Sequence, residues 1–366
     1  MQSTSTTLPS HPPINIKLVG LGGCGGNLVS AIRLPSAQVD MIVANTDQQD
    51  LVGRVNIPTR ILLGPQHTAG KGAGGVPEVG AAATRESEPV LAKALTGADL
   101  VVLVAGMGGG TGTGAAPIVA RLARQLGALT LAFVTMPFLV EKGQRSRAAE
   151  QGLAALTEAA DAVVVVSNQK ILNFVDPRET LTKALTYSNT ILSAAISGVI
   201  EQLSLPSLMQ LDFSHVRQTL SNAGQTMLGI GSASGNDAAQ RAVQQALKCD
   251  LLEGNLMKAK RIFVSIIGGN NLGLHDVSRA IDNIHQTIDN DINPVIGVAN
   301  SPALNHQDRV RVTLIASKVG SFRRLHHTMT TQPPSGSTRA DQPSLAFTQD
   351  QENLPPFLKL YRRGKV

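Results

Sequence analysis

The segment Gly108–Gly114, GGGTGTG, contains only glycine and threonine. It follows a continuous apolar run, ADLVVLVA (98–105), and precedes a helical pattern, APIVARLARQL (116–126). Such a segment cannot pack a core, but glycine lets backbone N–H groups approach a phosphate closely. The N-terminus of a following helix adds positive potential at the same place. The segment therefore predicts a phosphate-binding turn between a buried strand and a helix.

Two further glycine-rich turns have the same character, GLGGCGGN (20–27) and GKGAGG (70–75). A single turn of this kind often only connects a strand to a helix. Three of them on one sheet edge favour a bound polyphosphate. The hydroxyls of Thr111 and Thr113 can donate hydrogen bonds to phosphate oxygens.

Apolar runs separated by helical patterns predict the fold around these turns. VDMIVANTD (39–47), ALTLAFVTMP (128–137) and DAVVVVSN (161–168) are typical of strands buried on both faces of a parallel sheet. The segment AAEQGLAALTEAA (148–160) is typical of a helix. This alternation predicts an α/β fold with a Rossmann-like parallel sheet and with ligands at the carboxyl ends of the strands.

We expect several further segments along the chain. A disordered tail (1–13) precedes the first domain (14–176), and a long central helix (177–203) follows, capped by Asp176 with Pro177 at its first position. A loop (204–215) leads to a second α+β domain (216–320), and a Ser-, Pro- and Gln-rich disordered linker (321–352) follows it. Within the second domain we expect helices around 238–248 and 276–288, and strands at 261–269, 293–299 and 310–317.

Composition excludes several function classes. The net charge is +6, but residues 321–366 carry seven basic and three acidic residues, so the body is nearly neutral. With 3% aromatic residues and no tryptophan, we expect no nucleic-acid-binding surface. Two cysteines cannot form a disulfide framework or a zinc site. No signal peptide and no apolar stretch of ~20 residues is present, so we expect a cytoplasmic protein.

A dinucleotide-dependent enzyme is an alternative. Gly20, Gly22 and Gly25 fit G-x-G-x-x-G after a strand, and Asp47 closes the next strand, where a ribose-binding acid would lie. That reading leaves the third glycine turn unexplained. A Walker A motif is also excluded, because Gly70-Lys71 is followed by Gly72.

The sequence GGGTGTGAAP resembles the signature of the tubulin/FtsZ family of GTPases, and specifically its bacterial cell-division branch. Six segments occur in the family's order: GLGGCGGN, ANTDQQDL, GKGAGGVPEVG, AGMGGGTGTGAAPIVA, TMPFLVEKGQR and LMQLDFSHVR. The resemblance covers residues 14–320 and the last dozen residues. It implies a tubulin-like fold, binding of GTP or GDP with Mg²⁺, and head-to-tail self-polymerisation into the division-ring filament at the septum.

The resemblance also implies roles for individual residues. Phosphates would be lined by the first and third loops, the ribose and γ-phosphate flanked by the second loop, and the guanine met at the start of the long helix. The residues implied are Gly23, Cys24, Gly25, Gly26, Asn27, Asn45, Gly72, Ala73, Gly74, Gly110, Thr111, Gly112, Glu141, Arg145 and Asn168. We expect Cys24 to contribute its backbone rather than a reactive thiol.

The guanine site departs from the family pattern. The family usually has an aromatic residue at the position of Leu185 and an aspartate at the position of Thr190. Asn189 is a possible substitute for that aspartate. Each lost polar contact costs ~1–3 kcal/mol, so the hypothesis is that discrimination against ATP is weakened.

The larger departure lies in LMQLDFSHVR. In this family the active site is split, and the next subunit supplies Asn-x-Asp-x-x-Asp from the loop after the long helix. Here the catalytic candidates are Gln210, Asp212 and His215. A neutral imidazole accepts one hydrogen bond and recruits hard cations poorly. We expect slow GTP hydrolysis, with a non-hydrolysing scaffold or a copolymerising regulator as the alternative.

The C-terminal peptide (353–366) carries an apolar stripe at helical spacing, Leu354, Phe357, Leu358 and Tyr361, with basic residues around it. It is too short to form a stable helix alone and suits folding into a partner's groove. It resembles the peptide by which the family reaches membrane-tethering division proteins. We therefore expect only indirect contact with the membrane.

Overall fold

The computed structural model describes residues 14–34, 39–141, 143–171, 178–205, 207–209, 211–249, 256, 259–288, 292–305 and 308–317. The predicted tail (1–13), linker (321–352) and C-terminal peptide (353–366) lie outside these residues, as do Asp176, Pro177 and Gln210. Among the described residues, no helix is both long and apolar enough to cross a membrane.

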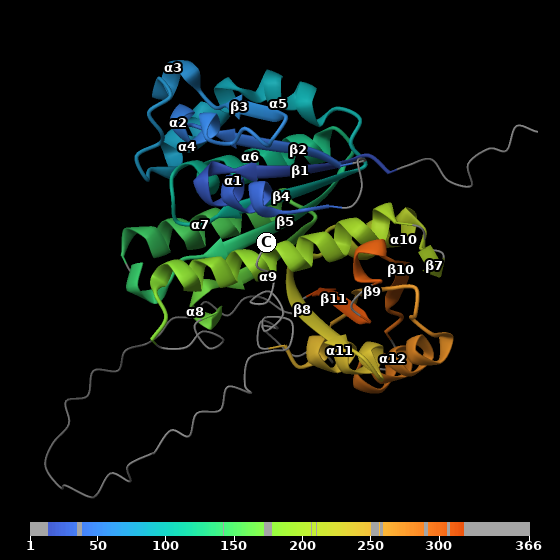
Figure 1. Cartoon of the computed structure of the whole chain (residues 1–366). Coiled ribbons are helices and arrows are strands. Elements are labelled where there is room, and N and C mark those ends of the chain that lie inside the picture. The colour runs from blue at the N-terminus through green and yellow to red at the C-terminus, as the bar shows by residue number, and fades with distance from the viewer. Residues whose placement is uncertain are drawn as a thin grey trace, which may run out of the picture.

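The first half of the chain forms the predicted parallel sheet (Figure 1). Its strands lie in the order β3-β2-β1-β4-β5-β6, which is the Rossmann order. They are β1 (Ile16–Leu21), β2 (Val39–Asn45), β3 (Thr59–Leu62), β4 (Leu100–Gly106), β5 (Leu129–Met136) and β6 (Ala162–Ser167). The helices between them are α1 (Gly22–Ala31), α2 (Gln48–Val52), α3 (Pro65–Thr68), α4 (Pro77–Glu86), α5 (Glu88–Leu95), α6 (Thr111–Gln125) and α7 (Gln144–Ala159), with the short helices η1 (Leu139–Glu141) and α8 (Asn168–Ile171).

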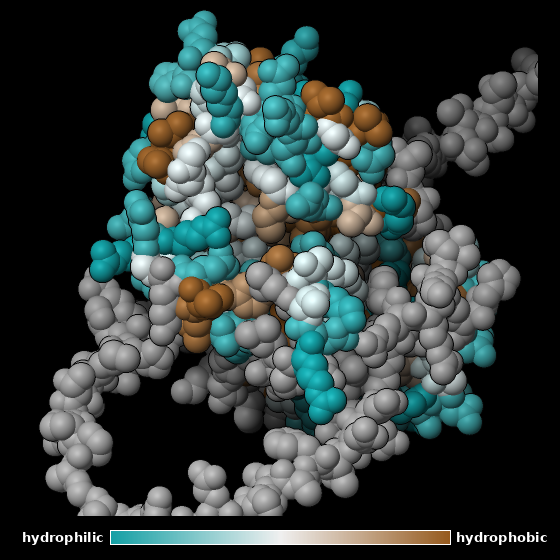
Figure 2. All heavy atoms as spheres, turned by 60° about the vertical axis from the view of Figure 1, so that its left-hand side comes forward, coloured by the Kyte–Doolittle hydropathy of each residue, from teal (hydrophilic) through white to brown (hydrophobic). Residues whose placement is uncertain are grey.

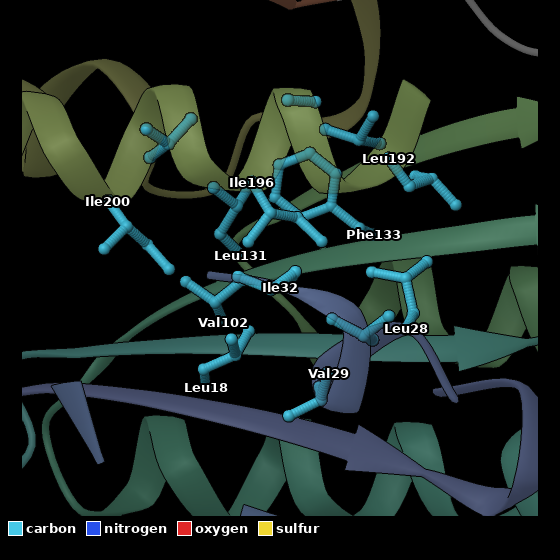
Figure 3. Close-up of a cluster of buried hydrophobic side chains, with 14 of the residues drawn as sticks. Leu18, Leu28, Val29, Ile32, Val102, Leu131, Phe133, Leu192, Ile196 and Ile200 are labelled. Carbon is cyan, nitrogen blue, oxygen red and sulfur yellow. The ribbon is translucent and has the colours of Figure 1, made fainter. Parts of the chain in front are cut away.

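Helices cover both faces of this sheet, which is why its strands are continuously apolar. Leu131 and Phe133 pack with α1 and with the long helix α9 (Leu181–Ser204), whereas Val134 packs with α6 and α7. Figure 3 shows the first of these interfaces, in which residues from β1, β4 and β5 meet the apolar faces of α1 and α9.

The long helix begins later than the sequence predicted. Helix α9 begins at Leu181, and its N-cap is Thr180, whose hydroxyl oxygen accepts a hydrogen bond from the Lys183 amide at 3.4 Å. The helix therefore begins four residues after the predicted start at 177, because a side chain closer to the apolar stripe satisfies the exposed amide, and the predicted cap Asp176 lies outside the described residues. The helix ends at Ser204, two residues before Pro206, which cannot continue it.

The second half of the chain is a mixed sheet with helices. Its strands lie in the order β8-β11-β9-β10-β7, with bounds β7 (Ser207–Met209), β8 (Gly224–Ser234), β9 (Ile262–Gly268), β10 (Val295–Asn300) and β11 (Arg309–Ser317). Its helices are α10 (Phe213–Leu220), α11 (Ala238–Leu247) and α12 (Leu274–Thr287), with the short helix η4 (Pro302–Leu304). The sequence predicted the strands corresponding to β9, β10 and β11 but missed β8, the longest strand described.

The two halves, which the sequence predicted as two domains, are joined in the described residues by one sheet of 11 strands. Three parallel residue pairs join β6 to β8: Ala162 with Gly224, Val163 with Gln225 and Val164 with Thr226. Asp161 holds this junction, because its side chain accepts the Thr130 amide at 2.9 Å and its carbonyl accepts the Gly224 amide at 3.0 Å.

Candidate functional site

The three glycine loops converge at the carboxyl edge of the parallel sheet. A Cβ atom added to Gly22 would lie 3.1 Å from the backbone nitrogen of Gly112, and one added to Gly110 would lie 2.8 Å from Cβ of Ala73. The first loop therefore touches the third, and the third touches the second. Gly22 also has a φ of +69°, in the left-handed region that favours glycine.

Helices α1 and α6 both begin at this junction. Helices α1 and α6 lack a side chain that caps the N-terminus, and neither has an acidic residue in its first turn. A Cβ atom added to Gly23 or Gly109 would meet no atom within 4 Å, so the loops border open space. Uncapped amides around an open space suit the oxygens of a polyphosphate.

The two threonines of the third loop have different roles. The hydroxyls of Thr111 and Thr46 lie 2.7 Å apart, at the meeting of the third loop and the end of β2. Thr113 is buried, and its hydroxyl accepts a hydrogen bond from the Gly108 amide at 2.9 Å. The prediction that Thr113 contacts phosphate is therefore wrong, since its side chain points inward from α6 and shapes the loop.

Sequence reasoning missed Arg54, whose buried side chain holds the first loop. Its guanidinium donates to the Gly23 carbonyl at 3.1 Å and to Oδ1 of Asn27 at 3.1 Å. It also donates to both carboxylate oxygens of Asp50, at 2.6 and 3.0 Å. A Cβ atom on Gly26 would lie 2.6 Å from Nε of Arg54, so glycine there makes room for the guanidinium. The available signal was the spacing of four between Asp50, which lies on α2, and Arg54, which lies just beyond its end.

Asn45, predicted to contact the nucleotide, lies in the same network. Its side chain is buried and donates to Oδ2 of Asp50 at 2.8 Å, while its Oδ1 accepts the Asp47 amide at 3.4 Å. Asp47 in turn caps α2 by accepting the Gln49 amide at 2.9 Å. These bonds fix the end of β2 beside the first loop.

The second loop is hydrogen-bonded to the end of β2. The Gly72 amide donates to the Thr46 carbonyl, and the Gln48 amide donates to the Gly70 carbonyl, both at 3.0 Å. Ala73 is buried against Gly110, whereas a Cβ atom on Gly74 would meet no atom within 4 Å. Gly74 thus faces open space, and Ala73 supports the third loop.

Cys24 lies beside Gly106 and Thr135. Its sulfur is 3.8 Å from the Thr135 hydroxyl, and a Cβ atom on Gly106 would lie 3.0 Å from that sulfur. Although part of the residue is exposed, desolvation raises the pKa of the Cys24 thiol, and the Thr135 contact only partly opposes this. A raised pKa disfavours a reactive thiolate.

The residues expected on the ribose side, Glu141 and Arg145, lie on η1 and α7, and those expected at the guanine lie on α8 and α9. Glu141 pairs with Arg145, and its other oxygen accepts the Phe138 amide at 3.1 Å. The buried Asn168 accepts the Ser188 hydroxyl at 2.9 Å, which joins α8 to α9. The Thr190 hydroxyl donates to the Thr186 carbonyl at 2.9 Å.

Leu185 and Asn189, the other two residues of the predicted base site, also lie on α9. Leu185 is exposed, and Asn189 is half-buried. Leu185, Asn189 and Thr190 therefore lie on neighbouring turns of α9, and the Ser188 hydroxyl joins that helix to Asn168 of α8.

Asp212 and His215, two of the predicted catalytic residues, lie away from the glycine loops. Asp212 caps α10 by accepting the Ser214 amide at 2.9 Å, and the exposed His215 lies in the first turn of this helix. Arg217 of α10 donates to the carbonyls of Asp99 and Gly127, which precede β4 and β5. Helix α10 is thus attached to the amino edge of the parallel sheet, opposite the glycine loops, and Figure 1 shows it at the end of α9 away from α8. One chain does not bring these side chains to its own loops.

Comparisons with known proteins identify the family to which this chain belongs. Residues 15–176 match the Tubulin/FtsZ family, GTPase domain, and residues 224–320 match the FtsZ family, C-terminal domain. The chain is 38% identical to Cell division protein FtsZ 1 of Archaeoglobus fulgidus, over 83% of this chain and 82% of that protein. The chain belongs to the FtsZ family. A cell division protein FtsZ of Methanothermobacter thermautotrophicus is also 38% identical, over 84% of this chain and 80% of that protein.

Solved structures agree with this family. An empty FtsZ dimer from M. jannaschii has a TM-score of 0.78 and 32% identity, covering 84% of this chain and 89% of that one. GDP-bound monomeric CetZ1 from Haloferax volcanii has a TM-score of 0.72 at 20% identity, covering 85% and 96%, which shows a shared fold.

FtsZ proteins are tubulin-like cytoskeletal GTPases of cell division that bind GTP or GDP and self-associate. The predicted fold and GTPase activity are confirmed, and the dinucleotide-dependent enzyme is excluded. The two curated FtsZ relatives are archaeal rather than bacterial.

Proposed function

We propose that this chain forms head-to-tail filaments at the division septum in the cytoplasm, and that each GTP is hydrolysed between two chains. The observation that carries the proposal is the position of the glycine loops and of Asp212 at opposite edges of the same sheet. Stacking two chains end to end would bring the α10 N-terminus of one to the loops of the other.

Exposed apolar side chains beside the loops support such stacking. Val76 lies in the turn after the second loop, Leu139 and Val140 lie in η1, and Leu185 lies near the start of α9; all four are exposed. Figure 2 shows that hydrophobic side chains on this side of the molecule form separate small groups among hydrophilic ones. Burying a large apolar side chain contributes about 1.5–3 kcal/mol, so covering these groups would favour association.

The chain's own residues would carry out the chemistry in two parts. Backbone amides of the first and third loops bind the phosphates and stabilise charge that develops on the γ-phosphate. The Asp212 carboxylate of the next chain orients the attacking water and accepts its proton. We further propose that Gln210 orients the same water and that His215 hydrogen-bonds to it.

Mg²⁺ would enter this site with the nucleotide. Among the described residues, no group of three or more His, Cys, Asp or Glu side chains could hold a metal ion. The carboxylates nearest the loops are engaged, since Asp47 caps α2 and Asp50 pairs with Arg54. Mg²⁺ usually keeps several waters and binds substrate phosphates with one or two carboxylates. We therefore propose that the GTP phosphates hold the Mg²⁺ and that it neutralises their charge.

Sedimentation with GTP or with GDP tests the proposal directly. We expect filaments to sediment with GTP, to remain largely in solution with GDP, and to release phosphate slowly. Sedimentation that is equal with both nucleotides would contradict GTP-dependent assembly. GTP-dependent sedimentation without any phosphate release would instead favour the non-hydrolysing scaffold or copolymerising regulator, which the histidine at position 215 also suggests.

His215→Asp is expected to raise phosphate release at least about tenfold, because a second carboxylate can hold a cation-bound water that imidazole cannot. Phosphate is measured per sedimented chain. His275→Asp, which makes the same change in the first turn of α12, is the control. Equal rates for His215→Asp and the unmodified protein would show that this position imposes no catalytic penalty.

Guanine selectivity is expected to be weak, with GTP preferred over ATP by less than about a thousandfold. The Thr190 hydroxyl donates within its own helix, and Leu185 provides no aromatic ring. Thr190→Asp supplies a carboxylate that can accept from the guanine N–H groups and should raise the preference about tenfold. Competition binding measures both, and a preference above a thousandfold in the unmodified protein would refute the hypothesis.

We propose that residues 353–366 bind membrane-tethering division proteins. Deleting them should abolish recruitment to tether-bearing vesicles while sedimentation with GTP is unchanged. A variant that keeps the apolar stripe but replaces Lys359, Arg362, Arg363 and Lys365 by glutamine separates groove binding from attraction to anionic lipid. Loss of assembly on deletion would contradict a separate tail function.

A further inference from the structure

We propose that Arg217 is a positioning residue for hydrolysis, which holds the Asp212 carboxylate where the next chain's GTP can meet it. The inference rests on the proposed two-chain site. Arg217 lies one turn along α10 from the cap formed by Asp212. Its Nη1 donates to the Gly127 carbonyl at 3.1 Å, and its Nη2 donates to the Asp99 carbonyl at 3.2 Å.

These two carbonyls belong to the rigid part of the GTPase half. The Asp99 carbonyl also accepts the Leu129 amide at 2.9 Å, so it lies where β4 and β5 begin to pair. Gly127 lies in the turn between α6 and β5. Strand β4 leads directly to the third glycine loop, so Arg217 fastens α10 to the elements that position the phosphate-binding loop of the same chain.

The segment around Asp212 is held from three sides. Leu211 and Phe213, its two neighbours, pack against the apolar core shared by the parallel sheet and α9. The guanidinium carbon of Arg217 lies 5.3 Å from the centroid of the Phe213 ring, within the range of a cation–π contact. Asp212 itself caps the helix. Arg217 thus adds two polar contacts that join α10 to the amino edge.

Arginine suits this role better than lysine. Its planar fork presents donors in a fixed geometry and can reach two carbonyls at once, whereas an ammonium is a compact group on a flexible stem. A displacement of 1 Å at a reacting group can cost about a hundredfold in rate. We therefore expect Arg217→Ala to lower the kcat of filament-bound hydrolysis between about tenfold and a hundredfold, with GTP affinity unchanged.

The experiment compares Arg217→Ala, Arg217→Lys, Asp212→Asn and the Arg217→Ala/Asp212→Asn double variant in the full chain. GTP binding to the unassembled chain, sedimentation, kcat and KM per sedimented chain, and the urea midpoint are measured. Arg241→Ala is the matched control, because Arg241 also donates to two backbone carbonyls, those of Ser234 and Asn236, but on α11. If Arg217→Ala does not sediment, the same quantities are compared for Arg217→Lys instead.

A residue that acts through Asp212 loses its effect when Asp212 cannot function. We expect Arg217→Ala to lower kcat with KM unchanged, Arg217→Lys to lower it less, and the double variant to match Asp212→Asn alone. The inference would be overturned if Arg217→Ala filaments hydrolysed GTP at the full rate. It would also be overturned if Arg217→Ala lowered kcat by the same factor in the Asp212→Asn background as in the unmodified protein. Full-rate hydrolysis by Asp212→Asn would instead overturn the two-chain site, so the two failures are distinguishable.

Discussion

Asp212→Asn should bind GTP and sediment with it, yet its rate of phosphate release should fall by about a hundredfold or more. Asparagine can cap α10 through its own Oδ1, as Asp212 does when it accepts the Ser214 amide at 2.9 Å, so the helix should persist. A neutral amide cannot accept a proton from water. The substitution therefore removes the proton acceptor while the cap of α10 is kept. Asp282→Asn, on the exposed side of α12, is the control and should hydrolyse at the normal rate.

Mixing two inactive variants shows whether the site spans two chains. A Cβ atom at Gly114 would lie 2.1 Å from the Pro77 carbonyl oxygen, so Gly114→Val should disrupt the third loop while leaving α10 intact. Mixed with Asp212→Asn, this variant can supply Asp212 to a partner that holds GTP. We expect the mixture to recover part of the hydrolysis rate. A mixture as inactive as its components would place the whole site in one chain.

Arg54→Met should weaken both the fold and nucleotide binding. It leaves the Asp50 carboxylate without its ion pair and removes the donors to the Gly23 carbonyl and Asn27. Because Asp50 is partly exposed, we expect a loss of about 2–3 kcal/mol in the free energy of unfolding, below the cost for a fully buried pair. The freed loop should bind GTP at least about tenfold more weakly.

Urea denaturation and GTP titration of the unassembled chain measure these two effects. Arg60→Met is the matched control, because Arg60 is an exposed arginine on β3 and its replacement should change neither quantity. If Arg54→Met bound GTP as tightly as the unmodified protein, the Arg54 network would have no part in shaping the first loop.

The strands that the sequence predicted are those in which burial on both faces leaves a nearly continuous run of apolar residues. Strands such as β4 and β5 are covered by helices on both faces, so nearly every residue in them is apolar. Strand β8 was not predicted, because Gly229 and Gly231 interrupt its apolar residues and polar residues lie towards both of its ends. A Cβ atom on Gly231 would lie 1.9 Å from the Ala242 carbonyl oxygen, so these glycines allow α11 to approach closely. That requirement comes from a helix later in the chain, and local pattern does not contain it.

In the candidate site too, some features could be predicted from local sequence and others could not. Spacing and glycine content located the three loops, because phosphate binding needs backbone that local sequence can provide. The inward direction of Thr113 depended on where α6 begins. Arg54 contacts Gly23 and Ser30 across 31 and 24 residues, a relation that only the folded chain reveals. Likewise, the attachment of α10 through Arg217 spans 90 residues to Gly127.

The placement of the glycine loops and α10 at opposite edges has an arithmetic consequence for assemblies. If each complete site needs the loops of one chain and the α10 of the next, a filament of n chains contains n − 1 complete sites. One terminal chain keeps its GTP intact, because no neighbour covers its loops, and the chain at the other terminus has an α10 with no nucleotide to act on. The rate per chain then rises from zero for a monomer toward a plateau as filaments lengthen. Fragmentation protects nucleotide and annealing exposes it to hydrolysis, so filament length itself sets how long each GTP survives.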